Sequence, residues 1–361
     1  MAVADEATGL RIAFIVREMP VGGLERVVIG LANALAGSGA QVKVLVMEDG
    51  DNNLLGELDS AVRIVVMAGS FWLRARTLYR EAKGCVAHVH FSEGRVRPIF
   101  RLFLPGPTVV TYHNRYFRPK AFDWADVFCS RAVDVLVAVS DEVRRACLHV
   151  GLPEGKLLVI RNGVVPPQHF DGVSPAPGHC VAVARAVPQK DYRTLLTGFA
   201  RACTLGAELQ LTVIGSGPDE AELQRLAVAL GIGPRVSWLG EVTSAETIHA
   251  TRRRAPIFLT ASRWEGFSLS VLEAMAAGQA VVASDISPHR EALGENGVYF
   301  APGDALGMGE ALAKLAADQD RQAELGRRGV TRAASFSLEN CVAEHVHLYL
   351  TLSERQSERR R

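Results

Sequence analysis

The chain has 361 residues, 48% hydrophobic and 22% charged, a balance typical of a folded globular protein and not of a disordered one. At roughly 150 residues per domain, this length predicts two domains. Forty basic residues against 39 acidic ones leave a net charge of +1, which argues against a general nucleic-acid-binding protein. No apolar run reaches the roughly 20 residues that a membrane-spanning helix needs.

The compartment is inferred from the N-terminus and the cysteines. Residues 1–10 lack the basic start and apolar stretch of a signal peptide. The six cysteines are scattered without a CxxC pair, which disfavours a disulfide framework or a zinc knuckle and fits a reducing environment. We therefore expect a cytoplasmic protein.

The first half alternates short apolar stretches with stretches of helical periodicity. We predict strands at Arg11–Val16, Gln41–Met47, Ala61–Met67, His88–Phe91, Thr108–Tyr112 and Val135–Val139. A helix is expected over Glu25–Ala36, and another after the sixth strand with Asp141 as its cap. This alternation indicates parallel βαβ units.

The pattern stops and then restarts. Residues 164–179 contain four prolines and two glycines, the composition of a linker. Strands are then predicted at Cys180–Ala184, Leu209–Ile214, Arg235–Leu239, Ile257–Ala261 and Ala280–Ser284. Helices are predicted at Tyr192–Leu205, Glu220–Leu230, around Glu246, and at Leu269–Ala277, Asp304–Asp318, Asp320–Ala334 and Leu338–Leu352.

These elements predict an α/β protein with two Rossmann-like, doubly wound domains facing each other across a cleft. The N-terminal domain is expected over residues 1–165, the linker over 166–178 and the C-terminal domain over 179–336. Residues 337–361 are expected to form a helix that crosses back to the N-terminal domain. Ligands of open parallel sheets bind beyond the carboxyl ends of the strands, so residues just after strands are the candidates for function.

Val21-Gly22-Gly23-Leu24-Glu25 follows the first strand. Two glycines let backbone N–H groups approach an anion at the start of a helix. The dinucleotide fingerprint GxGxxG and the phosphate-binding loop GxxxxGK[ST] are both absent. A plain tight turn is the alternative interpretation.

Residues 185–191, Arg-Ala-Val-Pro-Gln-Lys-Asp, follow the first strand of the second half. Arg185 and Lys190 lie five residues apart on a loop bent by Pro188, so both can reach a diphosphate. The alternative is a solvated basic loop.

Residues 264–273, Trp-Glu-Gly-Phe-Ser-Leu-Ser-Val-Leu-Glu, follow the strand Ile257–Ala261. Gly266 permits close approach of a ligand to the backbone, and Ser268 can cap the next helix. Glu265 is expected to point toward the cleft, and Glu273, inside the helix, can accept two ribose hydroxyls. The alternative is that both glutamates are solvated.

His88-Val89-His90 resembles a metal-binding pair. We expect the two rings on opposite faces of their strand. Because a metal needs convergent ligands, we expect no metal site there.

Taken together, these segments resemble the retaining glycosyltransferase family 4, the group 1 glycosyltransferases with the GT-B fold. The resemblance covers nearly the whole chain in order, and the segment EGFSLSVLEAMAAG carries it most specifically. One departure is that Ala184-Arg185 stands where the family usually has Gly-Arg. The other segments that carry it are Gly22-Gly23-Leu24-Glu25, Thr111-Tyr112-His113, Arg161-Asn162-Gly163-Val164 and Arg185 with Lys190-Asp191.

The resemblance implies the roles of residues at a donor site for a nucleotide diphosphate-sugar. Arg185 and Lys190 would hold the diphosphate, Glu273 the ribose, and Glu265 the donor sugar. His113 would contact the sugar near the reaction centre, with a structural histidine at a strand end as the alternative. The remaining donor-binding residues would be Gly22, Gly23, Gly217, Val242, Gly266, Phe267, Ser268 and Leu269.

The resemblance also implies transfer with retention, by attack of the acceptor hydroxyl on the face that the phosphate leaves. No protein nucleophile is expected, and double displacement through Glu265 is the minor alternative. No cofactor and no metal are expected, because Arg185 and Lys190 would compensate the charge of the leaving diphosphate. The donor is expected to be a UDP-sugar carrying a hexose or N-acetylhexosamine. The alternatives are a non-catalytic nucleotide-sugar-binding partner subunit and an epimerase of the same fold.

Residues 71–120 carry ten basic and two acidic side chains, a local charge of +8, interleaved with apolar and aromatic residues. Such a surface can contact an anionic membrane at the inner face or bind an anionic acceptor. The alternative is a solvated basic face whose aromatic residues belong to the core. The acceptor itself, whether a small molecule, an oligosaccharide or a lipid-linked intermediate, is left open. No nucleic-acid partner is expected.

Overall fold

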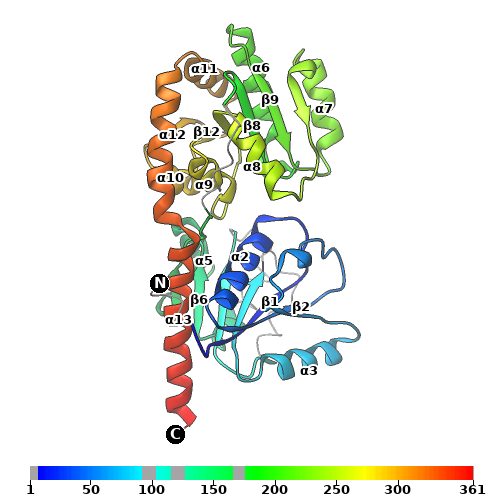
Figure 1. Cartoon of the computed structure of the whole chain (residues 1–361), viewed down its shortest axis with the longest axis vertical. Helices are drawn as coiled ribbons and strands as arrows, with labels where there is room; N and C mark the ends of the chain where they lie inside the picture. The colour runs from blue at the N-terminus through cyan, green and yellow to red at the C-terminus, as the bar shows by residue number, and fades with distance from the viewer. Residues whose placement is uncertain (1–6, 92–102, 115–126, 166–174, 361) are drawn as a thin grey trace. The chain divides into compact units, whose positions relative to one another are not determined.

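The computed structural model describes residues 7–91, 103–114, 127–165 and 175–360 of the chain (Figure 1). These residues form two compact units. The N-terminal unit consists of Met1–Gly163 with Leu338–Arg361, and the C-terminal unit consists of Val164–Ser337. Most of the predicted linker, residues 166–174, lies outside the described residues.

The N-terminal unit is built on a seven-stranded parallel sheet in the order β3-β2-β1-β4-β5-β6-β7. The strand order reverses between β1 and β4, as in a doubly wound sheet. The strands are β1 (Arg11–Val16), β2 (Gln41–Val46), β3 (Arg63–Val66), β4 (Val86–Phe91), β5 (Thr108–Tyr112), β6 (Val135–Ala138) and β7 (Leu157–Val159).

The helices of this unit are α2 (Gly23–Gly37), α3 (Phe71–Ala82), α5 (Asp141–His149) and α13 (Leu338–Arg360). Helix α13 lies beside α2 and contacts β4, although it comes from the end of the chain (Figure 1). Ser140, not Asp141 as predicted, caps α5, because the Ser140 side chain accepts a hydrogen bond from the Val143 backbone N–H. Asp141 is the first helical residue.

The C-terminal unit has a six-stranded parallel sheet in the order β10-β9-β8-β11-β12-β13, and its order reverses between β8 and β11. Its strands are β8 (His179–Val183), β9 (Gln210–Ile214), β10 (Val236–Trp238), β11 (Ile257–Thr260), β12 (Ala280–Ser284) and β13 (Gly297–Phe300). Its helices are α6 (Tyr192–Thr204), α7 (Glu220–Ala229), α8 (Ala245–Arg254), α9 (Leu269–Ala276), α10 (Ser287–Leu293), α11 (Ala305–Ala316) and α12 (Gln319–Ala333).

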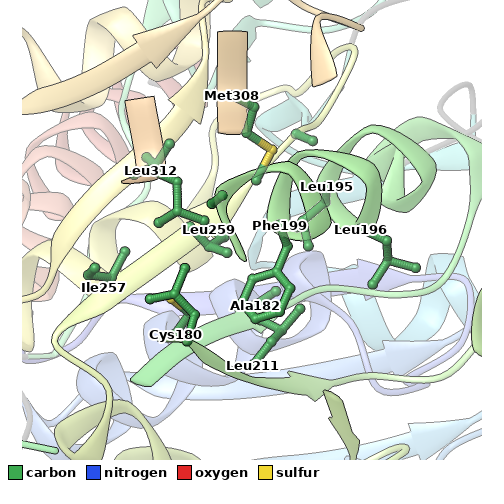
Figure 2. Close-up of a cluster of buried hydrophobic side chains, with 14 of the residues drawn as sticks. Cys180, Ala182, Leu195, Leu196, Phe199, Leu211, Ile257, Leu259, Met308 and Leu312 are labelled. Carbon is green, nitrogen blue, oxygen red and sulfur yellow. The ribbon is translucent and has the colours of Figure 1, made fainter. Parts of the chain in front are cut away.

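The core of the C-terminal unit lies between this sheet and helices α6 and α11. Figure 2 shows Phe199 of α6 and Leu312 of α11 among side chains from β8, β9 and β11. Strand β11 is buried along its whole length, as expected of a central parallel strand covered on both faces. The core therefore fixes the positions at which β8 and β11 end.

The predicted α/β class with two Rossmann-like sheets is confirmed. The predictions contained neither the short strands β7 and β13 nor helix α10. All six cysteines are free thiols. Among the helices of the described residues, none has the length and apolar character to cross a membrane.

Candidate active site

The loops that follow β8 and β11 lie next to each other, because these two parallel strands are neighbours and both end at the same edge of the sheet. This is also the point where the strand order reverses, which is the usual ligand site of such sheets. The first loop carries Arg185 and Lys190, and the second carries Glu265. The topology therefore brings together two motifs that are separated by more than 70 residues in the sequence.

Three hydrogen bonds join the two loops, through backbone and side-chain atoms. The Arg263 backbone N–H donates to the carbonyl of Gln189 at 2.9 Å, and the Gln189 side chain donates to the carbonyl of Trp264 at 2.8 Å. The Arg263 Nε donates to Asp191 Oδ2 at 2.9 Å. The loops are thus held in one arrangement, which is what a site for a charged ligand requires.

Asp191 occupies the turn into α6. Its φ of +46° is the left-handed conformation, which aspartate tolerates better than most residues. Its side chain accepts hydrogen bonds from the Thr194 backbone N–H and hydroxyl, so it caps α6 while it also binds Arg263. The sequence motif contains Asp191 but does not reveal this double role.

Lys190 and Glu265 form the ion pair at the centre of the site. The Lys190 Nζ lies 2.5 Å from Glu265 Oε1, and the Ser262 hydroxyl donates to the same oxygen at 2.7 Å. The Glu265 side chain is buried, with 8% of its surface exposed. Burial alone would raise the pKa of Glu265, but the Lys190 charge and the hydrogen bonds from Lys190 and Ser262 together lower it. Glu265 is therefore an ionised, anchored carboxylate, and the alternative of a solvated side chain is wrong.

Arg185 is the exposed cation of the first loop. The backbone of its neighbour Ala186 pairs with the loop after β9, because the Ala186 N–H donates to the Ser216 carbonyl at 2.9 Å. A Cβ at Gly217 would collide with the Ala186 carbonyl. Gly217 thus permits close packing of these two loops. Gly215 donates to the Gly240 carbonyl at 2.7 Å, which brings the loop containing Val242 beside them.

The segment after Glu265 is buried at the start of α9. Phe267 packs against the ring of Phe336, with ring centroids 5.6 Å apart. Ser268 occupies the N-cap position of α9, but its hydroxyl makes no capping hydrogen bond and contacts the Ser270 hydroxyl instead. The prediction that the Ser268 side chain caps the helix is therefore wrong.

Glu273 lies within α9, and its side chain is partly exposed but ion-paired. Its Oε2 accepts a hydrogen bond at 2.7 Å from the guanidinium of Arg252, a buried residue of α8. This partner could not be predicted from the sequence, because Arg252 belongs to a run of three arginines that is typical of an exposed helix end.

Gly22, Gly23 and His113 belong to the N-terminal unit. Gly22 is the N-cap of α2, and Gly23 is the first helical residue beyond β1. His113 follows β5, and its Nε2 lies 2.9 Å from Nδ1 of His90. Burial lowers the pKa of His113 to about 3, so this ring is neutral at physiological pH. The meeting of these residues with the C-terminal loops stays a prediction.

His88 and His90 lie on the same face of β4, so the expectation of opposite faces is wrong. Residues two apart on a strand share a face, and the two ring centroids are 4.0 Å apart. His88 is hydrogen-bonded to Tyr349 of α13 at 2.6 Å and to Thr111 at 2.7 Å. Within the described ranges, no group of three or more His, Cys, Asp or Glu side chains is arranged so that it could hold a metal ion.

Solved structures of other proteins share this fold. HepE from Anabaena, solved in complex with UDP, superimposes with a TM-score of 0.78 over 95% of this chain and 100% of that one, at 17% sequence identity. The fold is therefore GT-B.

Matches to models of known protein families identify the family to which the chain belongs. The model of the family "Glycosyl transferases group 1" matches residues 176–332, and that of "Glycosyltransferase Family 4" matches residues 21–166. The chain belongs to the group 1 glycosyltransferases.

Among curated relatives, a phosphatidyl-myo-inositol mannosyltransferase of Mycobacterium leprae is 27% identical over 327 residues, which cover 81% of this chain and 83% of that protein. An exopolysaccharide phosphotransferase of Streptomyces coelicolor is 27% identical over 235 residues, which cover 64% of this chain and 24% of that protein. Several other curated relatives are likewise matched over half of their length or less.

Proposed function

We propose that the protein transfers a hexose or N-acetylhexosamine from a nucleotide diphosphate-sugar, in the first instance a UDP-sugar, to a hydroxyl acceptor with retention. The observation that carries this proposal is the pair of loops at the reversal point of the C-terminal sheet. The loop after β8 carries the exposed Arg185 and, five residues later, Lys190, which forms an ion pair with Glu265 of the loop after β11. Membership of the group 1 glycosyltransferases supports the same reaction class.

In the proposed complex, Arg185 and Lys190 bind the diphosphate. Arginine supplies a planar fork and lysine a point charge, and both stabilise the negative charge that develops as the sugar–phosphate bond breaks. Lys190 is already fixed by Glu265, so it needs little reorganisation to do this. We propose that these two cations act in place of a divalent metal ion.

The other donor contacts follow from the same loops. The backbone of Gly266, Phe267, Ser268 and Leu269, at the start of α9, would face phosphate and sugar oxygens. Glu273 would accept hydrogen bonds from the ribose hydroxyls. The loops of Gly217 and Val242 would flank the base. Gly22, Gly23 and His113 would contribute from the N-terminal unit.

The chemical step we propose is same-face substitution. The acceptor oxygen bonds to the anomeric carbon while the bond from that carbon to the β-phosphate oxygen breaks. The electron pair stays on the phosphate oxygen, which then takes the proton of the acceptor hydroxyl. Glu265 is held by Lys190 and Ser262, and this supports an orienting role for it over that of a free nucleophile.

An acceptor attached to an anionic membrane is supported by α3. Its exposed surface carries Trp72, Leu73 and Tyr79, which are 72%, 52% and 50% exposed, beside the exposed basic residues Arg76 and Arg80. Arg74 and Lys83 of the predicted patch are also described, whereas its six basic residues from Arg95 to Lys120 lie outside the described residues. The M. leprae relative is named for a lipid acceptor, phosphatidyl-myo-inositol, which favours this acceptor class.

The experiment is a screen of nucleotide-sugars against hydroxyl acceptors, read by mass spectrometry, with Lys190→Met as the inactive control. Acceptor-dependent gain of one sugar mass, with the anomeric configuration retained by NMR, supports the proposal. Epimerised donor without transfer would identify an epimerase. Binding without any turnover across the screen would identify a non-catalytic subunit.

A further inference from the structure

Arg252 is a fully buried arginine, with only 1% of its side chain exposed. Burying a guanidinium costs free energy unless its charge is paired and its N–H groups are hydrogen-bonded, and Arg252 meets this through Nη1 and Nη2, whereas its Nε has no partner among the described residues. Arg252 Nη2 donates to Glu273 Oε2 at 2.7 Å, and Nη1 donates to the Ser270 carbonyl at 3.3 Å. Both partners lie on α9, so Arg252 joins α8 to the helix that carries the proposed ribose-binding carboxylate.

The backbone that bears Arg252 is also fixed. The Gln279 side chain donates to the carbonyls of Arg252 at 3.1 Å and of Ala255 at 2.7 Å. The Arg252 guanidinium lies 5.2 Å from the ring centroid of Phe258, a buried residue of β11. Both the backbone and the guanidinium of Arg252 are thus held in place, and the position of Arg252 does not depend on Glu273 alone.

Glu273 is anchored by one oxygen and open at the other. Its side chain is 34% exposed, and Oε2 is occupied by Arg252. In the part of the chain that the structure describes, no hydrogen bond to Oε1 is found. A glutamate held at one oxygen loses less side-chain entropy on binding a ligand than a free one, so it binds more tightly.

We propose that Arg252 is a positioning residue, which holds the Glu273 carboxylate oriented to accept the ribose hydroxyls of the donor nucleotide. This inference rests on the proposed function, because it assumes that Glu273 binds ribose. An ionised carboxylate only accepts hydrogen bonds, and two vicinal hydroxyls are matching donors. The specificity would be for ribonucleotides over 2′-deoxyribonucleotides.

The test measures dissociation constants for UDP and 2′-deoxy-UDP, or for GDP and 2′-deoxy-GDP where GDP binds the wild type more tightly. The readout is the ratio of the deoxy to the ribo constant. We expect a wild-type ratio of at least about ten, the effect of losing one hydrogen bond to a charged group. Arg252→Met is expected to bring the ratio below about three, mainly by weakening ribonucleotide binding. Arg254→Met, which removes an exposed charge from the same helix, should leave the ratio unchanged.

Two outcomes separate the inference from the function on which it rests. A wild-type ratio near one would contradict ribose binding by Glu273. A wild-type ratio above ten that persists in Arg252→Met would overturn the positioning role and leave the ribose role intact. If Arg252→Met does not fold, Arg252→Lys decides: a single ammonium cannot bind Glu273 and the Ser270 carbonyl in the same geometry. The ratio should then fall at least about threefold, and an unchanged ratio overturns the proposal.

Discussion

At the scale of single residues, Glu265 has two opposing effects on a donor. Its charge neutralises Lys190 and so weakens the attraction of the loop for a diphosphate. Its fixed carboxylate also orients the donor sugar in the proposed complex. We therefore predict that Glu265→Gln binds a nucleoside diphosphate at least as tightly as the wild type, whereas kcat falls about 10²-fold. Calorimetry and steady-state kinetics measure the two parameters separately.

The control for this variant is Glu222→Gln, which removes an exposed glutamate paired with Arg193 outside the site. It should change neither parameter. An unaltered kcat in Glu265→Gln would contradict the orienting role. A glycosyl adduct on Glu265, trapped and found by mass spectrometry in the wild type, would instead favour double displacement.

At the scale of elements, helix α3 presents an apolar and basic face. Trp72, Arg76 and Tyr79 follow one another at helical spacing and are all exposed. We predict that the double change Trp72→Ser and Leu73→Ser lowers binding to anionic vesicles several-fold, because it removes apolar area that would insert at the interface. Vesicle pelleting with and without phosphatidylserine measures this. Val228→Ser, at a residue 71% exposed in the C-terminal unit, is the matched control.

Equal pelleting of the wild type and the double variant would contradict the membrane role of α3. Pelleting that does not depend on phosphatidylserine would contradict the electrostatic part of it.

Helix α13 places His345 against His88 of β4. The ring centroids of His345 and His88 lie 5.5 Å apart, and burial lowers the pKa of His345 to about 4. The folded state therefore keeps His345 neutral, whereas the unfolded chain takes up a proton below the ordinary value of 6.5. Stability is thus lost as the pH falls from 6.5 toward 4, by up to about 1.4 kcal/mol per pH unit for each such histidine.

When the pH is lowered from 6 to 5, the free energy of unfolding should fall in the wild type. We predict that this fall is about 1 kcal/mol smaller in His345→Leu. Urea unfolding at the two pH values measures this difference. His347→Leu, at an exposed position of the same helix, should behave as the wild type. The same loss in His345→Leu and wild type would show that His345 does not resist protonation.

The sequence predicted most strands because the central strands of a parallel sheet are continuous apolar runs. Strands β7 and β13 are short and only partly buried, so they lack that pattern. The loop residues of the site were also predictable, since they follow strands. Their partners were not: the Lys190–Glu265 and Arg252–Glu273 pairs depend on which strands and helices become neighbours. The predicted faces of His88 and His90 were wrong because side chains two residues apart on a strand lie on the same face.

At the scale of the whole molecule, two sheets of the same architecture carry different parts of the proposed site. The C-terminal unit holds the Arg185, Lys190, Glu265 and Glu273 side chains, and the N-terminal unit holds Gly22, Gly23 and His113. The family models match the two units separately, which agrees with this division. The C-terminal unit is therefore expected to account for most of the affinity for the nucleotide.

In the proposed donor site, Arg185 and Lys190 bind a diphosphate without a metal ion. The direct measurement is calorimetric binding of UDP and UMP, or GDP and GMP, to the full chain in the presence of EDTA. We predict that the diphosphate binds roughly tenfold to a hundredfold more tightly than the monophosphate, and that Lys190→Met reduces this ratio below about threefold. Arg193→Met should retain it. Equal affinity for the two nucleotides, or a diphosphate preference that needs a divalent cation, would contradict the claim.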